Sequence, residues 1–574
     1  YLIDENTTAD IRDMGWHNLG RGAILDEAMI FSRSLSQAEI KALYNSKVNK
    51  FNTTNLSYSD GQHNYTVYAI DEYGNTANSG ERNFIISSGI DCGIISSPGI
   101  YTLTKNVSSI GTCFTVEVAN VTIDCNGYWI NYTGNDIGYY FGIQTNQFNT
   151  TVRNCNIYNY TAGIFFDRAD NGTIENNNIT IYNNKTLPTT IIDYGLTPRA
   201  SGILIHDSAN YNTIVNNTAY SHYGRGIYIN DANNNIIKNS NGSSYFNPGI
   251  QVYGGLGHGG SHNSIINSFG LSEESNGIRL GHYGHYNSII NSTAISNLEY
   301  AILADYGEFT NVINSLGNSS SNVGIYFLGI LNGNIINSTG FSNLTNGIEI
   351  TYSSHNNLIS NSTGIGYHTG IVLGGLLSSY PSNNNTLIDS NGTGGIAGIR
   401  LGGINNTIIR NRATGENEAY HLGSLNDSRI IDCVYTSGNL QDVYVSSVYL
   451  SVNNTFLNCS YDDEYFSEGS GEIIRKWYYQ AYTNYSNGTA VAGVNVTAYN
   501  SSGDIQFTTL TNPSGLINRQ EVIEYVNTGG TKNYYNNYTI NATLSGYETD
   551  SNVFNFTTTQ NKLDDVFTLQ GEFV

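Results

Sequence analysis

Isoleucine returns through the middle of this chain at a nearly constant interval, and this regularity constrains the fold more than any other feature. The commonest step is 23 residues, as between Ile325 and Ile348. The series, usually in a Gly-Ile phrase, is Ile143, Ile164, Ile203, Ile227, Ile250, Ile278, Ile302, Ile325, Ile348, Ile371 and Ile399. A unit of this length is too short for a βαβ crossover and too rich in β-branched residues for a helical hairpin. It predicts one coil of a three-sided parallel β-helix.

A second apolar series keeps the same interval and belongs to another strand of the same coil. Its members are Ile214, Ile236, Ile265, Ile289, Val312, Ile335, Leu358, Leu387 and Ile408. Between about 115 and 475 we expect about 13 to 14 coils, stacked at about 4.8 Å into a rod of roughly 60–65 Å. Each fully buried isoleucine then stabilises the stack by roughly 1.5–3 kcal/mol.

Polar residues at the turns keep the same period. Asparagine follows the apolar pair at Asn216, Asn267, Asn291, Asn314 and Asn337. Stacked amides at this place predict a local hydrogen-bonded ladder. The expected interruptions are Lys238, Ser360, Asp389 and Arg410. Glycine before isoleucine, as at Gly277 and Gly324, marks a corner that needs positive φ or close packing.

Composition agrees with an all-β fold of this kind. The 574 residues contain 62 glycines, 45 tyrosines and only 6 prolines, which suits short strands joined by tight turns. Only 12% of residues are charged and the net charge is -22, so a nucleic-acid partner is excluded from the expected functions. No run of about 18 apolar residues exists, so no membrane insertion is expected in this segment. We predict a right-handed parallel β-helix.

Three longer steps in the series predict loops that leave the rod. They lie near residues 182–199, 254–260 and 375–382. A solenoid accommodates extra residues on its faces, and the last two insertions follow the Gly-Ile strand. We therefore expect them on one side of the rod, where exposed tyrosines favour a contact surface.

The sequon Asn-x-Ser/Thr recurs roughly thirty times, which favours a glycosylated exterior surface. Composition alone explains about half of these sequons. The sites singled out for covalent N-glycans are Asn52, Asn64, Asn120, Asn171, Asn291, Asn361, Asn453 and Asn541. We expect an extracellular protein of the cell surface. No leader is visible at Tyr1, and we therefore expect a mature or truncated piece.

Six cysteines are expected to form three disulfides. Cys125 and Cys155 hold the same place in consecutive coils, as do Cys433 and Cys459, and vertical neighbours fall within the Cα separation that a disulfide accepts. The remaining pair, Cys92 with Cys113, would close the N-terminal cap. The alternative is reduced thiols stacked in the core. Metal ligation is not favoured, since no Cys-x-x-Cys motif occurs.

Residues 90–130, with Ile90-Asp91-Cys92-Gly93 and Val121-Thr122-Ile123-Asp124-Cys125, resemble the opening of archaeal NosD-like parallel β-helix repeat surface proteins. That resemblance implies the fold more than a function, because the family spans copper-maturation factors, polysaccharide enzymes and surface proteins. The β-helix domain is expected over residues 89–475.

The flanking segments resemble parts of β-sandwiches. Residues 20–44 are similar to the last strand and closing helix of a laminin-G/concanavalin-like jelly roll, so residues 1–49 are expected to be its C-terminal part. Residues 50–88 look like a partial Ig-like segment. Both look shortened, which suggests a processed N-terminus or strands donated by a neighbouring subunit. Residues 476–574 resemble a carboxypeptidase-regulatory-like, Ig-type β-sandwich that can cover the last coil.

Catalytic motifs are incomplete. The run Asp462-Asp463-Glu464 has no basic partner on the ladder and is interpreted as a solvated loop. Gly257-His258-Gly259 matches one element of the polygalacturonase pattern, but Arg279-Leu280-Gly281 lacks the lysine, and the aspartate pairs are missing. No catalysis is therefore expected. Weak candidates for Zn²⁺ or Cu²⁺ ligands are His258, His262, His282 and His285. We expect no cofactor, with structural Ca²⁺ as the one ion allowed for.

These observations favour a structural subunit of an archaeal surface layer, sheath or extracellular filament, whose partners are copies of itself. An adhesin or glycan-binding protein is the first alternative, and would present a tyrosine-lined groove on the loop face. A polysaccharide lyase or hydrolase is the second alternative, and would need a close-set acid cluster.

Overall fold

The computed structural model describes residues 61–66, 68–70, 76–78, 80–87, 89–135, 138–182, 200–255, 259–375, 380–448, 450–558 and 560–571. The chain divides into two units, residues 1–88 and 89–574, each of which is described by itself. In the first unit, β1 (Gly61–Tyr65) pairs antiparallel with β4 (Arg82–Ser87). A second antiparallel pair joins β2 (Tyr68–Ile70) to β3 (Thr76–Asn78). The jelly-roll resemblance at residues 20–44 lies outside the described residues.

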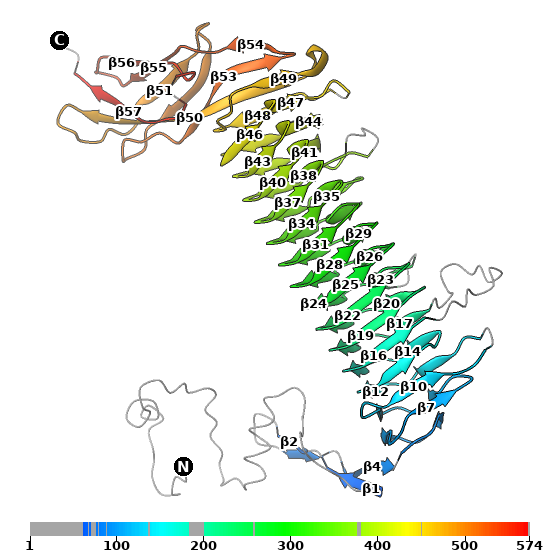
Figure 1. The fold of residues 1–574 in the computed structure, drawn as a ribbon. Coiled ribbons are helices and arrows are strands. Elements are labelled where there is room, and N and C mark those ends of the chain that lie inside the picture. Colours follow the sequence, from blue (N-terminus) through cyan, green and yellow to red (C-terminus); the bar gives the residue numbers. More distant parts are fainter. Residues whose placement is uncertain are drawn as a thin grey trace, which may run out of the picture. The chain divides into compact units, whose positions relative to one another are not determined.

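The second unit begins with a right-handed parallel β-helix (Figure 1). Successive strands along the chain belong in turn to three parallel sheets, here called sheets I, II and III. Sheet I contains β6 (Gly99–Thr102), β9 (Val121–Asp124), β12 (Thr151–Arg153), β15 (Thr173–Glu175), β18 (Thr213–Val215), β21 (Ile236–Lys238), β24 (Ser264–Ile266), β27 (Ser288–Ile290), β30 (Asn311–Ile313), β33 (Asn334–Ile336), β36 (Leu358–Ser360), β39 (Thr386–Ile388), β42 (Thr407–Ile409), β45 (Arg429–Ile431) and β48 (Asn454–Leu457).

Sheets II and III complete each coil. Sheet II contains β7 (Val107–Ser109), β10 (Trp129–Tyr132), β13 (Asn156–Tyr158), β16 (Asn178–Ile181), β19 (Thr218–Ser221), β22 (Asn241–Ser244), β25 (Phe269–Ser272), β28 (Thr293–Ser296), β31 (Leu316–Ser319), β34 (Thr339–Ser342), β37 (Thr363–Gly366), β40 (Asn391–Gly394), β43 (Arg412–Gly415) and β46 (Tyr435–Gly438). Sheet III contains β5 (Gly93–Ile95), β8 (Phe114–Val116), β11 (Phe141–Thr145), β14 (Ala162–Asp167), β17 (Ser201–His206), β20 (Arg225–Asn230), β23 (Ile250–Tyr253), β26 (Ile278–Gly281), β29 (Ile302–Asp305), β32 (Ile325–Leu328), β35 (Asn346–Thr351), β38 (Thr369–Leu373), β41 (Ala397–Ile404), β44 (Glu418–Asn426), β47 (Gln441–Val445) and β49 (Glu464–Phe466).

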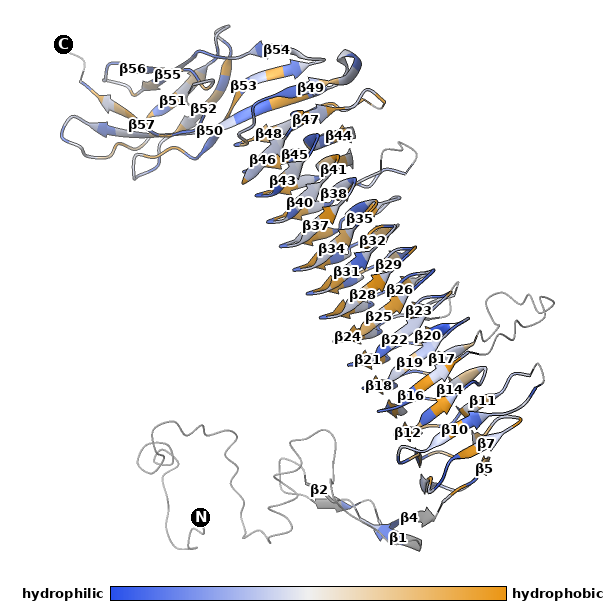
Figure 2. Cartoon of the chain, viewed as in Figure 1, coloured by the Kyte–Doolittle hydropathy of each residue, from blue (hydrophilic) through white to orange (hydrophobic). Residues whose placement is uncertain are grey.

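The Gly-Ile series forms one continuous inner column, as predicted. Each isoleucine pairs in register with the next along sheet III, from Ile143 over Ile164 to Ile371 over Ile399, and all of them are fully buried. Apolar residues recur from coil to coil in the same places (Figure 2). Sheet I has 14 described strands between residues 115 and 475, in agreement with the expected 13 to 14 coils. Sheet III has 16 described strands because it begins earlier, at β5, and it extends over about 70 Å for a spacing of about 4.8 Å.

The sheet I column corrects two register assignments. Ile214 pairs with Ile237 rather than Ile236, and Ile335 pairs with Ile359 rather than Leu358. Ile236 is 39% exposed, whereas Ile237 is fully buried. In a strand, neighbouring side chains point to opposite faces, so a slip of one residue exchanges inside for outside.

The asparagine at the end of each sheet I strand is a left-handed turn residue. From Asn216 to Asn337 the residues at this place have φ between 48° and 56°. Asn239 and Asn361 hold the place that we assigned to Lys238 and Ser360, so these two interruptions were wrong. Asparagine tolerates this backbone region better than most residues, which explains its abundance.

The ladder of buried hydrogen bonds lies one residue beyond the expected asparagines. At that place, the backbone N–H of one coil donates to a side-chain oxygen of the next, as from Ser268 to Ser292 Oγ over 3.1 Å. A second ladder precedes sheet I, where Asn263 N–H donates to Asn287 Oδ1 over 2.9 Å. These bonds satisfy turn amides that the rod removes from water. The Gly-Ile glycines serve close packing, since a Cβ at Gly324 would lie 2.4 Å from the backbone nitrogen of Phe341.

Both ends of the rod are covalently closed and the C-terminal end is also capped. The disulfides are Cys92–Cys113, Cys125–Cys155 and Cys433–Cys459, the predicted pairs. After the 3₁₀ turn η2 (Ser467–Gly469), the strand β50 (Glu472–Tyr485) pairs with β48 of the last coil. Its second half enters a β-sandwich of two sheets. One contains β50, β53 (Gln520–Thr528), β54 (Thr531–Tyr534) and β57 (Lys562–Leu569), and the other β51 (Asn495–Tyr499), β52 (Ile505–Leu510), β55 (Tyr538–Thr543) and β56 (Asp550–Phe554).

Candidate functional site

The outer face of sheet III gathers most of the chemically versatile side chains of the rod. The residue after each Gly-Ile isoleucine points outward, and some of these side chains are nevertheless buried, such as Leu204 at 0% and Tyr228 at 7% exposure. They pack against one another from coil to coil, in a cluster that includes Phe141 and Ala162. Two insertions follow strands of sheet III, as predicted, and the third precedes one, so the insertions leave the rod at both edges of this face.

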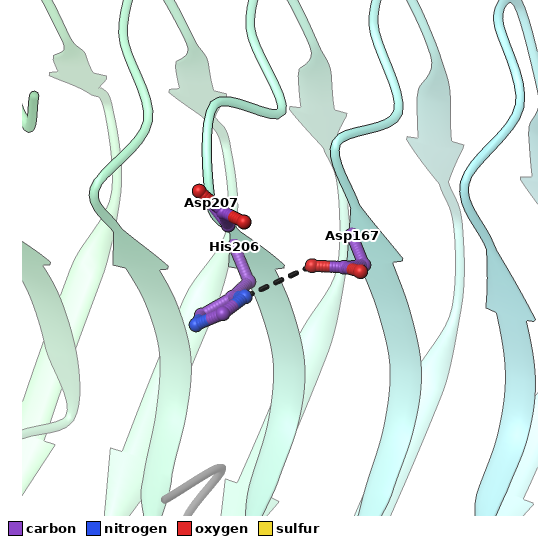
Figure 3. Close-up of side chains that lie close together, drawn as sticks. All are labelled: Asp167, His206 and Asp207. Atoms are coloured by element: carbon purple, nitrogen blue, oxygen red, sulfur yellow. Dashed lines mark hydrogen bonds and ion pairs between the residues drawn. The ribbon is translucent and has the colours of Figure 1, made fainter. Parts of the chain in front are cut away.

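Asp167 and His206 form the first polar pair on this face (Figure 3). They end β14 and β17 and are direct partners in the register, with Asp167 Oδ1 3.0 Å from His206 Nδ1. Arg168 Nη2 donates to Asp167 Oδ2 over 2.8 Å. Burial acts to raise the pKa of Asp167, but the bonds from His206 and Arg168 outweigh it and hold that pKa below its usual value.

Asp207 lies close to Asp167 and His206. Their possible metal-ligand atoms all lie within 4.8 Å of one another, and this is the one such group of three among the described residues. Arg168 also lies 3.6 Å from Asp207, so a guanidinium already balances both carboxylates. One imidazole with two carboxylates differs from the all-oxygen set that Ca²⁺ prefers. The group therefore gives no support to structural Ca²⁺, which stays a prediction.

Arg279 and Asp305 form the second pair, on β26 and β29, with the coils of β20 and β23 between the two pairs. The guanidinium donates twice to the carboxylate, over 3.1 Å from Nε and 2.8 Å from Nη2. Asp305 is 3% exposed, and its carboxylate is 3.4 Å from Nδ1 of His282. Burial opposes the charge of Arg279, but the bonds to Asp305 raise its pKa above the usual value. The structure thus uses Arg279, which we compared with a catalytic motif, as a fixed ion-pair partner.

A third group lies nearer the C-terminal end. Glu349 accepts a hydrogen bond from Asn346 over 2.7 Å, and Glu418 lies 2.7 Å from Nδ1 of His421. Burial raises the pKa of Glu349, against the opposing effects of Asn346, Thr351 and Arg400. Burial also disfavours the charged form of Arg400 and lowers its pKa, and Nε of Arg400 makes no hydrogen bond.

The predicted histidine ligands do not converge. His258 lies outside the described residues. His262 stacks on Tyr286, with ring centroids 4.8 Å apart, while His282 stacks on Tyr253. Among the described residues, no group of three close donors includes His262, His282 or His285.

The acidic run in the last coil corrects our interpretation at one residue, because Asp462 and Asp463 are exposed as expected for a solvated loop whereas Glu464 is part of a joint. The Glu464 side chain is fully buried and accepts a hydrogen bond from Tyr525 of the sandwich over 2.6 Å. Asn527, also of the sandwich, donates to the same carboxylate over 2.5 Å. Asp463 accepts from the backbone of Asp442 over 2.6 Å. Glu464 therefore joins the last coil to the sandwich.

The predicted glycosylation sites in the rod share one environment. Asn120, Asn171, Asn291, Asn361 and Asn453 are all exposed, and their φ values lie between 47° and 64°. In the first unit Asn64 is exposed, and its amide donates to Glu81. Asn541 is half-buried in β55 and accepts a bond from Ser551 over 2.8 Å. Asn52 lies outside the described residues. Glycosylation at these sites stays a prediction.

A shallow hollow of about 330 Å³ lies at the turns between sheets II and III, near the C-terminal end of the rod. Its lining includes Tyr367, Thr393, Gly395, Glu416 and Asn439. Here the turns are one residue shorter than in earlier coils and begin with glycine instead of serine. Tyr367 is 63% exposed at its rim.

Sequence reasoning missed the polar pairs of sheet III, although a signal existed. Asp167 and His206, and likewise Arg279 and Asp305, occupy the outward positions of Gly-Ile strands in nearby coils. Aligning the coils on their isoleucines would have placed His206 directly over Asp167, and Asp305 two residues along the strand from the partner of Arg279. Asp167 and Asp305 each have a basic partner and form fixed charge pairs, whereas Arg400, near Glu349, has an Nε without a hydrogen bond.

Comparison with known proteins agrees with the coil geometry. The family described as a right handed beta helix region matches residues 141–268. No curated protein shows significant sequence similarity to this chain. Within the described part of the chain, no helix has the length and apolar character of a membrane span. The match and the stacked coils together establish a parallel β-helix protein.

Several solved structures are similar to parts of this chain, at low identity and with TM-scores below 0.5. The TIE protein of Bacillus anthracis is 16% identical, with 18% of this chain and 19% of that chain covered and a TM-score of 0.14. The A-module of mannuronan C-5 epimerase AlgE4 from Azotobacter vinelandii is 13% identical. The similarity covers 55% of this chain and 91% of that chain, with a TM-score of 0.34. PfbA, a surface adhesin of Streptococcus pneumoniae, is 13% identical. The similarity covers 73% of this chain and 89% of that chain, with a TM-score of 0.25. These likenesses concern the fold alone.

Proposed function

We propose that this chain is a structural, N-glycosylated component of the outer surface of an archaeal cell, in a surface layer, a sheath or an extracellular filament. The carrying observation is the unbroken stack of coils that continues into the sandwich through β50. This strand pairs with β48 over Asn454–Leu457 and with β57 over Tyr479–Tyr485. One strand shared by two cores makes a stiff joint.

The joint is reinforced at its charged and aromatic contacts. Arg475, which is 9% exposed, lies over the ring of Tyr461 at 4.2 Å and over that of Trp477 at 5.1 Å. Glu464 accepts bonds from the sandwich, as described above. Broken buried charge pairs are strongly destabilising, so the two parts are expected to resist separation. Such stiffness suits a load-bearing element.

The turn columns support the glycosylated exterior. The exposed left-handed asparagines present their amide groups away from the core, as an oligosaccharide transferase requires of its acceptor. The resemblance of residues 90–130 to archaeal NosD-like surface proteins, and of residues 476–574 to carboxypeptidase-regulatory-like modules, supports the same location. Three disulfides suit an oxidising exterior.

Electron cryo-tomography of the native envelope with an antibody against the chain tests this proposal. The expected result is label on a repeated outer structure, together with glycan masses on peptides that contain Asn291 or Asn361. Label confined to the cell interior would overturn it. Release of new chain ends from a polysaccharide panel by the purified protein would overturn the non-catalytic part.

Glycan binding is a second candidate, favoured by the hollow beside Tyr367. An exposed ring next to glycine corners leaves room for a sugar to stack. Binding to a neutral glycan on an array, lost in Tyr367→Ala and kept in Tyr158→Ala, would support this candidate. Equal binding by both variants would refute it.

A further inference from the structure

Ring-bearing residues at the turns between sheets III and I have backbone conformations that such residues rarely adopt, and six of them lie in three neighbouring coils and the coil after next. We call this set the aromatic strip, and it consists of His262, Tyr283, Tyr286, Tyr306, Phe309 and Tyr352. All six have φ between 53° and 63°. Bulky side chains in the left-handed region are outliers, and strain of this kind collects where a protein needs a particular surface.

The strip interrupts a column in which asparagine is the commonest residue, and Tyr211 is one further ring in that column. Immediately before sheet I, each coil has one left-handed residue, and this residue is Asn171 early in the rod and Asn384 or Asn405 late in it. His262, Tyr286 and Phe309 replace asparagine at this place in three successive coils. The sequence thus gives up the residue best suited to the backbone in order to place rings there.

The same replacements remove sequons. Asn120, Asn149, Asn171, Asn384, Asn405 and Asn453 hold this place and are each followed by a threonine two residues later. His262 and Tyr286 keep the serine of the sequon, in His262-Asn263-Ser264 and Tyr286-Asn287-Ser288, but lack the asparagine. The column therefore has no acceptor between 211 and 356, while it has one in coils on both sides. The aromatic strip lies in this interval of the column, while Asn291, a predicted glycosylation site, lies in the same coil at the other end of β27.

Ring orientation limits what can bind. Tyr286 stacks on Phe309 with centroids 4.7 Å apart and planes 4° apart, and on His262 at 4.8 Å and 15°. The stacked faces contact one another, so the ring edges point outward. A sugar stacks on ring faces. Ring edges instead suit the side chains of another protein, which they can meet in edge-to-face contacts.

We propose that the aromatic strip is the lateral contact between two copies of this chain, an inference that rests on the proposed function in a surface assembly. A second rod presents the same strip at the same spacing of about 4.8 Å, so that the outward ring edges of the two rods can meet along both strips. A two-fold axis makes one patch complementary to itself. None of the six residues carries a carboxylate, which favours contact at this place between two chains of net charge -22.

The exposed area fits a weak, specific contact. Tyr283, Tyr286, Tyr306, Phe309 and Tyr352 are 37–49% exposed. At roughly 200 Å² for an aromatic residue, the strip with His262 offers about 500 Å² per copy. Two copies together bury about 1,000 Å², the lower limit for a specific interface. Association should therefore be reversible and should strengthen as salt screens the net charge.

Sedimentation velocity on the full chain from a non-glycosylating host tests the contact. Wild type should show concentration-dependent dimers, more at 0.5 M than at 0.1 M NaCl. Tyr286→Asn/Phe309→Asn should stay monomeric to at least tenfold higher concentration, with an unchanged or higher melting temperature, because asparagine suits this backbone. Tyr367→Asn, an exposed tyrosine outside the strip, should associate like wild type. A monomeric wild type, or an unaffected double variant, would overturn the proposal.

An added glycan provides a second test that keeps all six rings. Asn332 is the next left-handed residue after Phe309 in the column, and Asn334→Thr completes its sequon. Threonine already occupies the equivalent strand position at Thr386 and Thr407. The glycosylated variant should remain monomeric, whereas the same variant without glycan should dimerise. Dimers in both forms would contradict a contact through the strip.

Two further results separate this inference from its alternatives. Glycan-array binding that disappears in Tyr286→Asn/Phe309→Asn, with a monomeric wild type, would assign the strip to a saccharide instead of a second copy. Tomography that places the chain in a surface layer, with neighbouring rods meeting elsewhere, would remove the lateral contact and leave the proposed function. Dimerisation through the strip by a chain found inside the cell would refute the proposed function and leave the lateral contact.

Discussion

Asn287 carries two buried hydrogen bonds in the middle of the rod, and its removal should be costly. Its Oδ1 accepts the backbone N–H of Asn263 over 2.9 Å, and its Nδ2 donates to the carbonyl of Gly260 over 2.6 Å. Asn287 is 1% exposed. Asn287→Ala leaves a donor and an acceptor without partners, at about 1–3 kcal/mol each. We expect a loss of about 4 kcal/mol in the free energy of unfolding.

Asn291→Ala is the matched control in the same coil. Asn291 is exposed, with φ of 49°, so alanine there loses only the conformational tolerance of asparagine, at about 1 kcal/mol. Urea denaturation gives both values, and hydrogen exchange at the amide of Asn263 should accelerate in Asn287→Ala alone. Equal losses in the two variants, or a loss below about 1 kcal/mol in Asn287→Ala, would refute the assignment of the ladder.

Ile302→Ala should lose about 3–5 kcal/mol because Ile302 is fully buried in the column, while Ile365→Ala, at a residue 38% exposed, should lose under about 1 kcal/mol by the same denaturation assay. Cys433→Ser/Cys459→Ser opens a link between residues 26 apart, worth about 3.5 kcal/mol, and limited proteolysis should cut the last coils first; cutting in the middle of the rod would contradict this. The pKa of Glu349 is raised in the folded state, so its ionisation destabilises the fold as pH rises above about 4.5. Glu349→Gln should therefore stabilise the protein at pH 7 but not at pH 4, and a gain that is the same at both pH values would contradict the raised pKa.

Some features of the site could have been predicted from the sequence, and some could not. Cys125 and Cys155 share a place in consecutive coils, so their pairing followed from the period alone. His262 and His285 are 23 residues apart, in successive coils with His282 in the second of these, but the ring directions of the three were set by their neighbours. Tyr253 stacks on His282, and Asp305 lies 3.4 Å from it. Side-chain direction is set by packing, which periodicity does not encode.

The sequence by itself determined the coil. The recurrence of isoleucine at 23 residues fixes which side chains stack, because like residues must repeat at one place for a column to close. Register within the coil was decided only by the tertiary structure. Ile236 and Ile237 are both apolar, so the sequence offers either one for the core, and neighbouring coils bury only Ile237. Likewise, charge alone suggested water for Glu464, whereas the sandwich folds back over the last coil and supplies hydroxyl and amide donors that a local reading cannot place.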